Sequence, residues 1–514
     1  MTIQLPKSAS LAVNPTQAEM REWVAQMPNS QLTEFDNYNI KARVTARSGG
    51  STFIVTDDAS FTPKQTMSRA DYQRVVRMQD EYVADADMLV VEGYIGPENS
   101  PMRKPTRVLI ERSNANIPGM QRQLYYPKDA DWREEDVLTV IYTPNLPAQG
   151  FPGEKLVTID LENWVTRVFA IDYFGESKMG GLCMWMEWVF QRGALAMHAG
   201  AKMIPTDNGD RLGLIIGMSG TGKTTTTFTR QNDSLPVQDD ICALVSGGQV
   251  YATENGCFAK TYGLDPDDEP TIHGALTQPS AWLENVAVDE QGKVDFFDDS
   301  YTANGRGTFE LSEIEHFDPR KIGKADFLLI LNAQQTIVPA VAKMSSPEQA
   351  AAYFMLGETV GTSAGGADEA GKSLRVPGTN PFFMGYEFQQ GNRLLEMIQT
   401  MDYDFGVYVM STGRVGGSEE VEGSKKVKIR HSSAIVKAIA EGTITWEEDP
   451  DFGYLVATSV PDFDDPELLQ PRRLYGSQSR RDEYEQLVND LKAERIAYMK
   501  EHEGLREDIL DALK

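Results

Sequence analysis

A glycine-rich stretch, GMSGTGKTTTTF at residues 217–228, has the residue types and spacing of a phosphate-binding loop. Gly217 to Thr224 satisfy the pattern G-x-x-x-x-G-K-[ST], and the apolar run LGLIIG leads into it. Glycines let backbone N–H groups turn toward a phosphate, because side chains there would obstruct the turn. We therefore expect Lys223 to reach the β- and γ-phosphates of a nucleotide and Thr224 to hold Mg²⁺. A chance glycine-rich turn is the alternative.

A pair of acids, Asp239 and Asp240, follows the loop after the apolar run LPV. Two carboxylates beside a phosphate loop suit Mg²⁺ or Mn²⁺, and a solvated turn is the alternative. Asp240 comes only seventeen positions after Lys223. This separation leaves little room for the long helical crossover of the usual parallel P-loop sheet, so a different nucleotide-binding fold is indicated.

Several segments must position these residues, and their patterns predict a mixed α/β protein. STFIVTD, VLTVIYT and KLVTIDL predict strands in the first two hundred residues. Residues 175–204 predict an apolar-rich helix followed by a strand that carries His198. Residues 327–332 and 405–411 are buried-strand candidates, whereas the Gly- and Ala-rich residues 356–371 predict a mobile segment. The C-terminal helix, with Tyr484, Leu487, Leu491 and Met499 at helical spacing, is predicted to serve packing alone.

The length of 514 residues predicts two domains, and the polar residues 205–211 are a candidate joint, with a loop within one domain almost as good an interpretation. The net charge of −27, from 49 basic and 76 acidic residues, argues against nucleic acid or anionic membranes as partners. The chain has no run of about 18 apolar residues that would span a bilayer. Three cysteines form no disulfide framework, and the N-terminus has no secretory pattern, so we expect a cytoplasmic protein.

An ordered series of short motifs resembles the ATP-dependent phosphoenolpyruvate carboxykinases from about residue 40 to about residue 480. The motifs are ARSGGS, YFGESKMGG, MHAG, GMSGTGKTT, QDD, GCFAKTYGL, LENVAV, NGRGTF, VPAV, STGRVGG and KKVKIRHSSAIVKAI. The resemblance implies an N-terminal substrate-side α/β domain, residues 1–204, and a C-terminal nucleotide-binding domain with P-loop and lid, residues 205–514. It also implies conversion of oxaloacetate and ATP to phosphoenolpyruvate, ADP and CO₂.

The resemblance implies roles for residues on the substrate side. Arg47 would face a substrate carboxylate, and Tyr173 would line the substrate and CO₂ pocket. Lys178 would lie near the substrate, and Lys260 and Arg306 would neutralise charge on the moving phosphoryl group, together with Lys223. The alternative interpretation is that Arg47 and Arg306 are ordinary surface arginines and that Lys260 is a lysine at a strand edge.

The resemblance likewise implies how ATP and the metal ions, Mg²⁺ and Mn²⁺, would be bound. His198 and Asp240 would be ligands of the ion that draws charge from the enolate oxygen, with a second ion beside Thr224. A satisfied core histidine is the rival interpretation of His198. Asp239 would be part of the catalytic group. The residues that would contact nucleotide are Gly217, Ser219, Gly220, Thr221, Gly222, Lys223, Thr224, Thr225, Lys426, Val427 and Ser432, and Ser219 could instead meet the substrate.

Several positions depart from the family pattern. The family's metal-binding lysine, the second of a Lys-Lys pair, is Met179 here, after Lys178. A thioether is a poor ligand for Mn²⁺ or Mg²⁺. Two lysines after the substrate arginine are replaced within residues 48–51, and the third acid of the Asp-Asp-Glu motif is Ile241. The family's mobile lid carries a lysine and a Gly-Thr-Glu run, and this sequence has Glu358 and residues 361–363 at those positions.

These departures leave three functions open. The first is a true carboxykinase, because Arg47, Tyr173, His198 and Arg306 are all present. The second is a kinase of the same fold that phosphorylates another small hydroxyl compound or a protein side chain. The third is a nucleotide-binding regulator without catalysis, although the presence of Lys223, Thr224 and Asp240 together speaks against it.

Overall fold

The computed structural model describes residues 5–218, 220–360 and 373–514. By its internal contacts the chain divides into two compact units. Unit 1 holds Met1–Arg192, Ala252–Glu315 and Phe382–Gly385, and unit 2 holds Gly193–Tyr251, His316–Pro381 and Tyr386–Lys514. Each unit therefore combines segments that are distant in sequence. The assignment of residues 1–204 to a substrate-side domain and 205–514 to a nucleotide-binding domain stays a prediction.

A large mixed sheet forms the centre of unit 1, with strand order β1-β6-β7-β9-β11-β10-β4-β5 and β8 paired to β6. Its strands are β1 (Ser10–Val13), β4 (Thr52–Val55), β5 (Thr66–Met67), β6 (Asp87–Ile95), β7 (Lys104–Glu111), β8 (Tyr126–Pro127), β9 (Leu138–Thr143), β10 (Leu156–Asp160) and β11 (Val165–Phe169). The strands β4, β9 and β10 confirm the three alternating runs noted in the sequence.

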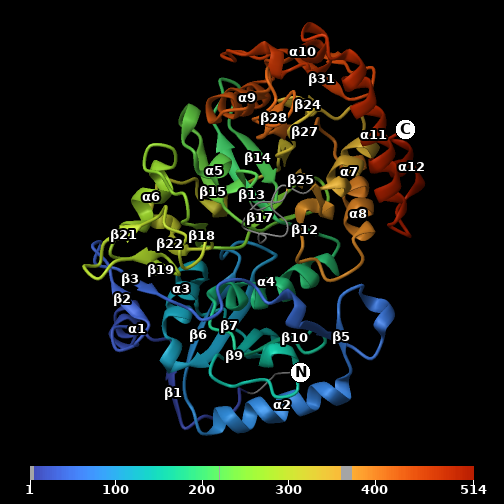
Figure 1. The fold of residues 1–514 in the computed structure, drawn as a ribbon. Helices are drawn as coiled ribbons and strands as arrows, with labels where there is room; N and C mark the ends of the chain where they lie inside the picture. Colours follow the sequence, from blue (N-terminus) through green and yellow to red (C-terminus); the bar gives the residue numbers. More distant parts are fainter. Residues whose placement is uncertain (1–4, 219, 361–372) are drawn as a thin grey trace. The chain divides into compact units, whose positions relative to one another are not determined.

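Two helices cover opposite faces of this sheet, α2 (Arg69–Ala84) and α4 (Phe174–Phe190) (Figure 1). Side chains alternate between the two faces of a strand, and the contacts follow that alternation. Val83 of α2 packs in one cluster with Ile141 of β9. Gly180 of α4 approaches the neighbouring residue, Val140, so closely that an added Cβ would lie 3.2 Å from its Cγ2. The sheet thus fixes α4, which carries several of the predicted site residues.

A second sheet of unit 1 has the order β18-β22-β19-β3-β2. Its strands are β2 (Ser30–Leu32), β3 (Tyr38–Ile40), β18 (Gly256–Lys260), β19 (Trp282–Glu284) and β22 (Arg306–Glu310). The hairpin β20 (Ala287–Val288) and β21 (Val294–Asp295) and the helices α1 (Gln17–Val24), α3 (Asn116–Leu124) and α6 (Pro270–Leu276) complete the unit. In this sheet Arg306 lies opposite Lys260 on one side and opposite Glu284 on the other.

A mixed sheet with the order β15-β13-β14-β23-β27-β24-β31-β30 forms the centre of unit 2. Its strands are β13 (Ala199–Ile204), β14 (Arg211–Ile216), β15 (Leu235–Gln238), β23 (Phe327–Asn332), β24 (Val341–Lys343), β27 (Gly406–Ser411), β30 (Thr445–Glu448) and β31 (Leu455–Ser459). A smaller sheet joins β12 (Leu195–Met197), β16 (Cys242–Leu244) and β17 (Val250–Ala252). The buried strands β23 and β27 were both predicted.

The segment from β13 to β15 arranges the glycine-rich loop. Residues 205–210 connect β13 and β14, which pair antiparallel, so the predicted joint at 205–211 is a hairpin loop that ends in the first residue of β14. The chain then passes through a short helix, α5 (Lys223–Phe228), and returns to the sheet as β15, on the far side of β13. This connection is as short as the spacing between Lys223 and Asp240 requires.

Helices α7 (Pro347–Leu356), α8 (Phe388–Gln399), α11 (Arg481–Lys500) and α12 (Glu507–Asp511) lie together in unit 2 (Figure 1). The hairpin of β25 (Glu358–Val360) and β26 (Ser373–Arg375) is tied to α11 through Glu358, whose carboxylate accepts from Arg495 at 2.6 Å. Residues 361–372, which include most of the segment predicted to be mobile, lie outside the described residues. The remaining elements of unit 2 are β28 (Arg414–Val415), β29 (Lys425–Lys426), α9 (Ile429–Glu441) and α10 (Pro471–Ser477).

Other expectations from the sequence can be compared with the structure. The predicted packing helix is α11, which α12 follows; Tyr484, Leu491 and Met499 are buried as predicted, and Leu487 is partly buried. His198 is not inside a strand, because it lies between β12 and β13, which belong to different sheets. The cysteines are buried, and within the described part of the chain they form no disulfide. Among the helices of residues 5–218, 220–360 and 373–514, none is long and apolar enough to cross a bilayer.

A buried lysine of β13, Lys202, fixes the end of α5. Its ammonium group donates to the carbonyl oxygen of Thr226 at 2.8 Å and to that of Thr229. The last carbonyl groups of a helix have no partner within the helix, so Lys202 satisfies two of them. The residue is 4% exposed, and burial lowers the pKa of its ammonium to about 7.

We expect Lys202→Met to change how stability depends on pH. The unfolded chain keeps this lysine protonated up to its ordinary pKa of 10.5, so between about 7 and 10.5 the unfolded state binds more protons than the folded state. In that range the wild-type free energy of unfolding should rise relative to the variant, by up to about 1 kcal/mol per pH unit. Urea unfolding followed by tryptophan fluorescence at pH 7, 8 and 9 measures the difference. Lys343→Met, on β24, is the control, because this lysine is 25% exposed. Its free energy of unfolding should change with pH in the same way as that of the wild type. Parallel curves for Lys202→Met would contradict the prediction.

Candidate active site

The glycine-rich loop of unit 2 begins directly after β14. A Cβ on Gly217 would lie 2.3 Å from Oγ1 of Thr221, so only glycine fits there. Thr221 donates from its hydroxyl group to the carbonyl oxygen of Met218 at 2.7 Å, which closes the turn. Gly220 and Gly222 have φ angles of 86° and 88°, a backbone region that favours glycine. Ser219 lies outside the described residues.

Three predicted site residues of unit 2 meet at one carboxylate oxygen. Oδ1 of Asp240 is 2.9 Å from Nζ of Lys223 and 3.0 Å from Nε2 of His198. Lys223 begins α5, Asp240 follows β15, and His198 lies between β12 and β13. A Cβ on Gly200 would lie 2.1 Å from Oγ1 of Thr227, so this glycine lets α5 lie close against β13. The helix start and the histidine are thereby held beside the same acid.

The backbone fixes the ring orientation of His198. Its Nδ1 is 2.8 Å from the carbonyl oxygen of Thr379. A carbonyl oxygen can only accept, so Nδ1 carries a proton. In the neutral ring Nε2 is then the lone-pair nitrogen, and it faces the carboxylate of Asp240. A nitrogen lone pair and a carboxylate oxygen that face each other together form a pair of donors for a cation.

The other predicted nucleotide residues of unit 2 lie on nearby or separate elements. Thr224 and Thr225 are in the first turn of α5 and are partly exposed, whereas Asp239 is buried after β15. Lys426 ends β29, and the buried Val427 donates its N–H to the carbonyl oxygen of Gly413 at 3.0 Å. Ser432 lies in the first turn of α9.

In unit 1, Glu176 of α4 holds the loop that carries Arg47. Its Oε2 is 3.3 Å from Nη2 of Arg47, and its Oε1 accepts from the N–H of Ser48 at 2.5 Å. Burial by itself would lower the pKa of Arg47, but the Glu176 carboxylate outweighs it and the pKa lies above its ordinary value. The ring of Phe382 lies 5.0 Å from the guanidinium. Arg47 is therefore a fixed, charged guanidinium of the kind that binds a carboxylate.

Asn304 connects Tyr173 with Arg306. Its Oδ1 accepts from Nη2 of Arg306 at 2.8 Å, and its Nδ2 donates to the Tyr173 hydroxyl group at 3.4 Å. A Cβ on Gly175 would lie 2.4 Å from Cε1 of Tyr173, so glycine allows the ring to fold over the first turn of α4. Burial raises the pKa of Tyr173, although Arg306 lowers it in part, so the hydroxyl group stays protonated near neutral pH. Tyrosine, amide and guanidinium thus form one polar group.

Lys260 and Arg306 are neighbours across β18 and β22. Burial lowers the pKa of Lys260, and the charge of Arg306 lowers it further. Two cations on paired positions repel each other, and an anion that lies between them relieves that repulsion. The pair is suited to bind a phosphate or carboxylate group.

Lys178 is already engaged by an acid within unit 1. Its ammonium group lies 3.2 Å from Oε2 of Glu254, and both side chains are almost fully buried. A buried lysine needs such a partner, because desolvation of an unpaired charge is costly. Met179, the next residue of α4, is buried as well.

Four polar side chains of these clusters were not assigned from the sequence, namely Glu176, Glu254, Glu284 and Asn304. Three of them stand inside motifs that the sequence analysis noted, YFGESKMGG, LENVAV and NGRGTF. A charged or amide side chain inside such a motif is the signal that could have found them. Glu254 lies outside every noted motif.

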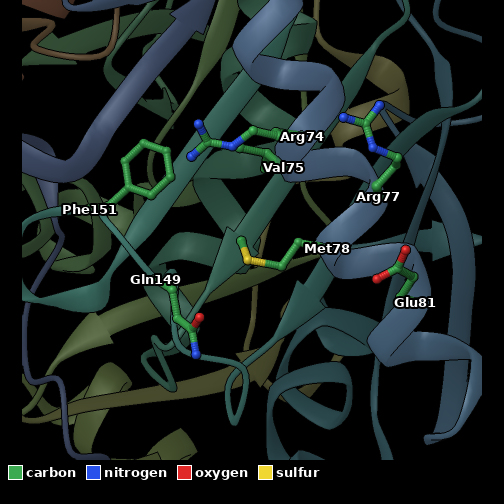
Figure 2. Close-up of a pocket in the computed structure, with 7 residues that line it drawn as sticks. All are labelled: Arg74, Val75, Arg77, Met78, Glu81, Gln149 and Phe151. Atoms are coloured by element: carbon green, nitrogen blue, oxygen red, sulfur yellow. The ribbon is translucent and has the colours of Figure 1, made fainter.

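A surface cavity of about 390 Å³ in unit 1 lies on α2, away from the residues discussed above. Its lining consists of Arg74, Val75, Arg77, Met78, Glu81, Gln149 and Phe151, which come from α2 and the loop before β10 (Figure 2). None of these residues is a predicted site residue. The cavity therefore takes no part in the candidate active site.

Comparison with known proteins identifies the family. A family described as phosphoenolpyruvate carboxykinase matches residues 9–466. The chain is 28% identical over 446 residues to phosphoenolpyruvate carboxykinase (ATP) of Alkaliphilus oremlandii, covering 83% of this chain and 80% of the relative. The same name belongs to a relative from Aeropyrum pernix, 28% identical over 469 residues, with 86% and 89% coverage. A Campylobacter jejuni relative of that name is 33% identical over 300 residues, with 58% and 55% coverage. With a match over most of its length, the chain belongs to the phosphoenolpyruvate carboxykinase family.

Proposed function

We propose that this protein is an ATP-dependent phosphoenolpyruvate carboxykinase, which converts oxaloacetate and ATP to phosphoenolpyruvate, ADP and CO₂. Loss of CO₂ leaves its bonding electrons on the remaining fragment as an enolate, and the enolate oxygen then takes the γ-phosphoryl group from ATP. Membership of the family supports this reaction. The observation that carries it is the meeting of Lys223 and His198 at one oxygen of Asp240.

Unit 2 supplies the nucleotide-binding half in this proposal, with residues 217–224 as the P-loop. Backbone N–H groups of the loop and the ammonium group of Lys223 would bind the phosphates, and Thr224 and Thr225 would lie beside them. Lys426, Val427 and Ser432 would contact the adenine. The carboxylate of Asp240 balances the charge of Lys223 at 2.9 Å, which fixes the position of its ammonium group.

The donor atoms near Asp240 fit a hard divalent cation. The Nε2 of His198 is turned toward Oδ1 of Asp240 by the bond of Nδ1 to Thr379, and imidazole with carboxylate is a donor set that Mn²⁺ accepts. Within the described residues no third histidine, cysteine or acid completes a cluster. The remaining positions would fall to water, substrate or phosphate oxygens, and Thr224 would hold a second ion, Mg²⁺, beside the nucleotide phosphates. When bound, such an ion would stabilise negative charge on the enolate oxygen.

Unit 1 supplies the substrate half in this proposal. Arg47, fixed by Glu176, would hold a carboxylate of oxaloacetate, and Tyr173 would lie along the substrate. Lys260 and Arg306 would balance charge on the phosphoryl group in transfer, and Lys178 would lie near the substrate. We infer small molecules as the partners of the protein and the cytoplasm as its location, in keeping with an excess of acidic residues and no membrane-spanning helix among the described residues.

We expect Lys223→Ala to abolish most of the carboxykinase activity. The wild-type protein receives phosphoenolpyruvate, bicarbonate, ADP, Mg²⁺ and Mn²⁺, and oxaloacetate is measured by coupled reduction. Loss of one preorganised cation at the phosphoryl group should lower kcat by about 100-fold or more. Lys324→Ala, an exposed lysine paired with Asp402, is the control and should retain wild-type activity.

Two other outcomes of this assay would contradict the proposal and favour a different function. A wild-type protein that forms no oxaloacetate but moves the γ-phosphate of ATP to another acceptor would be a kinase of the same fold. A wild-type protein that binds ATP and transfers nothing would be a nucleotide-binding regulator.

We expect Asp240→Asn to weaken Mn²⁺ binding more than about tenfold, because an amide oxygen lacks the charge of the carboxylate. Free Mn²⁺ measured by electron paramagnetic resonance gives the affinity without turnover. Asp404→Asn removes an exposed carboxylate and is the control. Equal Mn²⁺ affinities of the Asp240→Asn variant and wild type would rule out Asp240 as a ligand.

A further inference from the structure

Glu284 is a fully buried carboxyl group that the proposed reaction leaves without a role. It ends β19, and its Oε1 accepts a hydrogen bond of 2.9 Å from the N–H of Phe174, the first residue of α4. Tyr173, the N-cap residue of α4, makes no side-chain cap hydrogen bond. Glu284 therefore caps α4 from a distant strand, because a helix N-terminus leaves its first N–H groups without helical partners.

The second carboxyl oxygen, Oε2, is also buried, and it has no hydrogen-bond partner among the described residues. Folded proteins contain few such groups, and each one calls for an explanation. Arg306 offers one, because it lies directly opposite Glu284 in the antiparallel pair of β19 and β22. Directly opposed side chains project from the same face, with Cβ atoms about 5 Å apart.

Arg306 likewise has a buried polar atom without a hydrogen-bond partner. Its Nη2 donates to Asn304, but its Nε is buried and lacks a partner among the residues that the structure describes. The strand register thus places an acceptor and a donor, each without a partner, on neighbouring positions. A guanidinium group held at Nε presents its two terminal nitrogens to an anion in a fixed orientation.

The surroundings of Glu284 favour its neutral form at pH 7. Burial raises the pKa of Glu284 to about 8, the N–H of Phe174 and the charge of Arg306 lower it, and Asp172 raises it. Tyr142 and Tyr173 are further titratable groups that face the carboxyl group. A neutral carboxyl group leaves the charge of Arg306 available for an anion, and its oxygen can still accept from Nε.

We propose that Glu284 is a positioning residue for the reaction: one carboxyl oxygen holds the start of α4, beside Tyr173, and the other is the acceptor placed to pair with Nε of Arg306. This inference rests on the proposed function, in which Tyr173 and Arg306 meet the substrate. Glu284 touches neither substrate nor nucleotide, and it acts by fixing the residues that do.

A double-mutant cycle tests the proposal. Glu284→Gln keeps an oxygen for the N–H of Phe174 but puts an NH₂ group, which cannot accept, next to Arg306. Arg306→Lys keeps the charge and removes Nε. We expect Glu284→Gln to lower kcat/KM about tenfold beside Arg306 and less than about twofold in the Arg306→Lys background. Glu310→Gln, at the other end of β22, is the matched control and should leave kcat/KM unchanged in both backgrounds.

The pH profile gives a second readout that a purely structural role would not move. In the wild type, ionisation of Glu284 near pH 8 sets a negative charge beside Arg306, so kcat/KM should fall there. Glu284→Gln should lack that fall, and its deficit against wild type should shrink toward pH 9. The proposal is overturned if Glu284→Gln lowers kcat/KM by the same factor in the wild type and in Arg306→Lys. It is also overturned if the pH profile of kcat/KM in Glu284→Gln matches that of the wild type.

Two further measurements keep the test decisive. If Glu284→Gln does not fold, the wild-type and Arg306→Lys profiles decide. Arg306→Lys removes the Nε donor that would favour the ionised carboxylate, so the fall near pH 8 must move to higher pH, and an unshifted fall overturns the proposal. If the wild-type protein shows no carboxykinase turnover, the proposed function fails by itself. The same cycle is then measured on the affinity for phosphoenolpyruvate by calorimetry, and equal factors there overturn the inference.

Discussion

One carboxylate oxygen, Oδ1 of Asp240, holds the candidate nucleotide site together. It is within 3.0 Å of both Lys223 and His198. The three residues come from different parts of unit 2: Lys223 begins α5, His198 lies between β12 and β13, and Asp240 follows β15. The hydrogen bond from the ammonium group of Lys223 is charge-assisted and therefore stronger than a neutral one, and a largely buried ammonium group without such a partner would be costly. The position of Lys223 at the start of α5 therefore depends on this acid, whereas His198 is held beside it by the carbonyl oxygen of Thr379.

The cations of unit 1 follow the same rule. Arg47 is held by Glu176, Lys178 by Glu254, and Arg306 by Asn304. Each of these three cations is oriented by a protein group, so little rearrangement would be needed to meet an anionic substrate. A chain with 76 acidic residues and 49 basic ones thus uses part of its acidic excess to fix the few cations that chemistry would need.

The sequence predicted the parts of the fold that local pattern determines. The apolar runs at 327–332 and 405–411 are strands, since a short buried strand is recognised by composition and length. The phosphate-loop pattern and the pair of acids soon after it indicated that Lys223 and Asp240 lie near each other, and the two side chains are in contact. The prediction that a strand carries His198 was wrong. The chain passes at that residue from one sheet to another, and the periodicity of the sequence does not mark such a change.

Contacts between distant segments could not be predicted in this way. Nothing near His198 indicates that the carbonyl group of Thr379 fixes its ring, because the two residues are joined only by the fold of unit 2. Likewise, Glu284 faces Arg306 because β19 and β22 pair in one register, and register depends on packing across the whole sheet. The resemblance to a family indicated which residues matter, whereas their partners emerged only from the structure.

The assembly of unit 1 from separated stretches bears on how the chain is made. Tyr38–Ile40 pairs in parallel with Trp282–Glu284. During synthesis on the ribosome, the first of these strands must wait on the order of 10 to 50 s for its neighbour to emerge. Until then the edge of Tyr38–Ile40 that pairs with Trp282–Glu284 has no partner, and an unpaired strand edge is a site at which other chains can add.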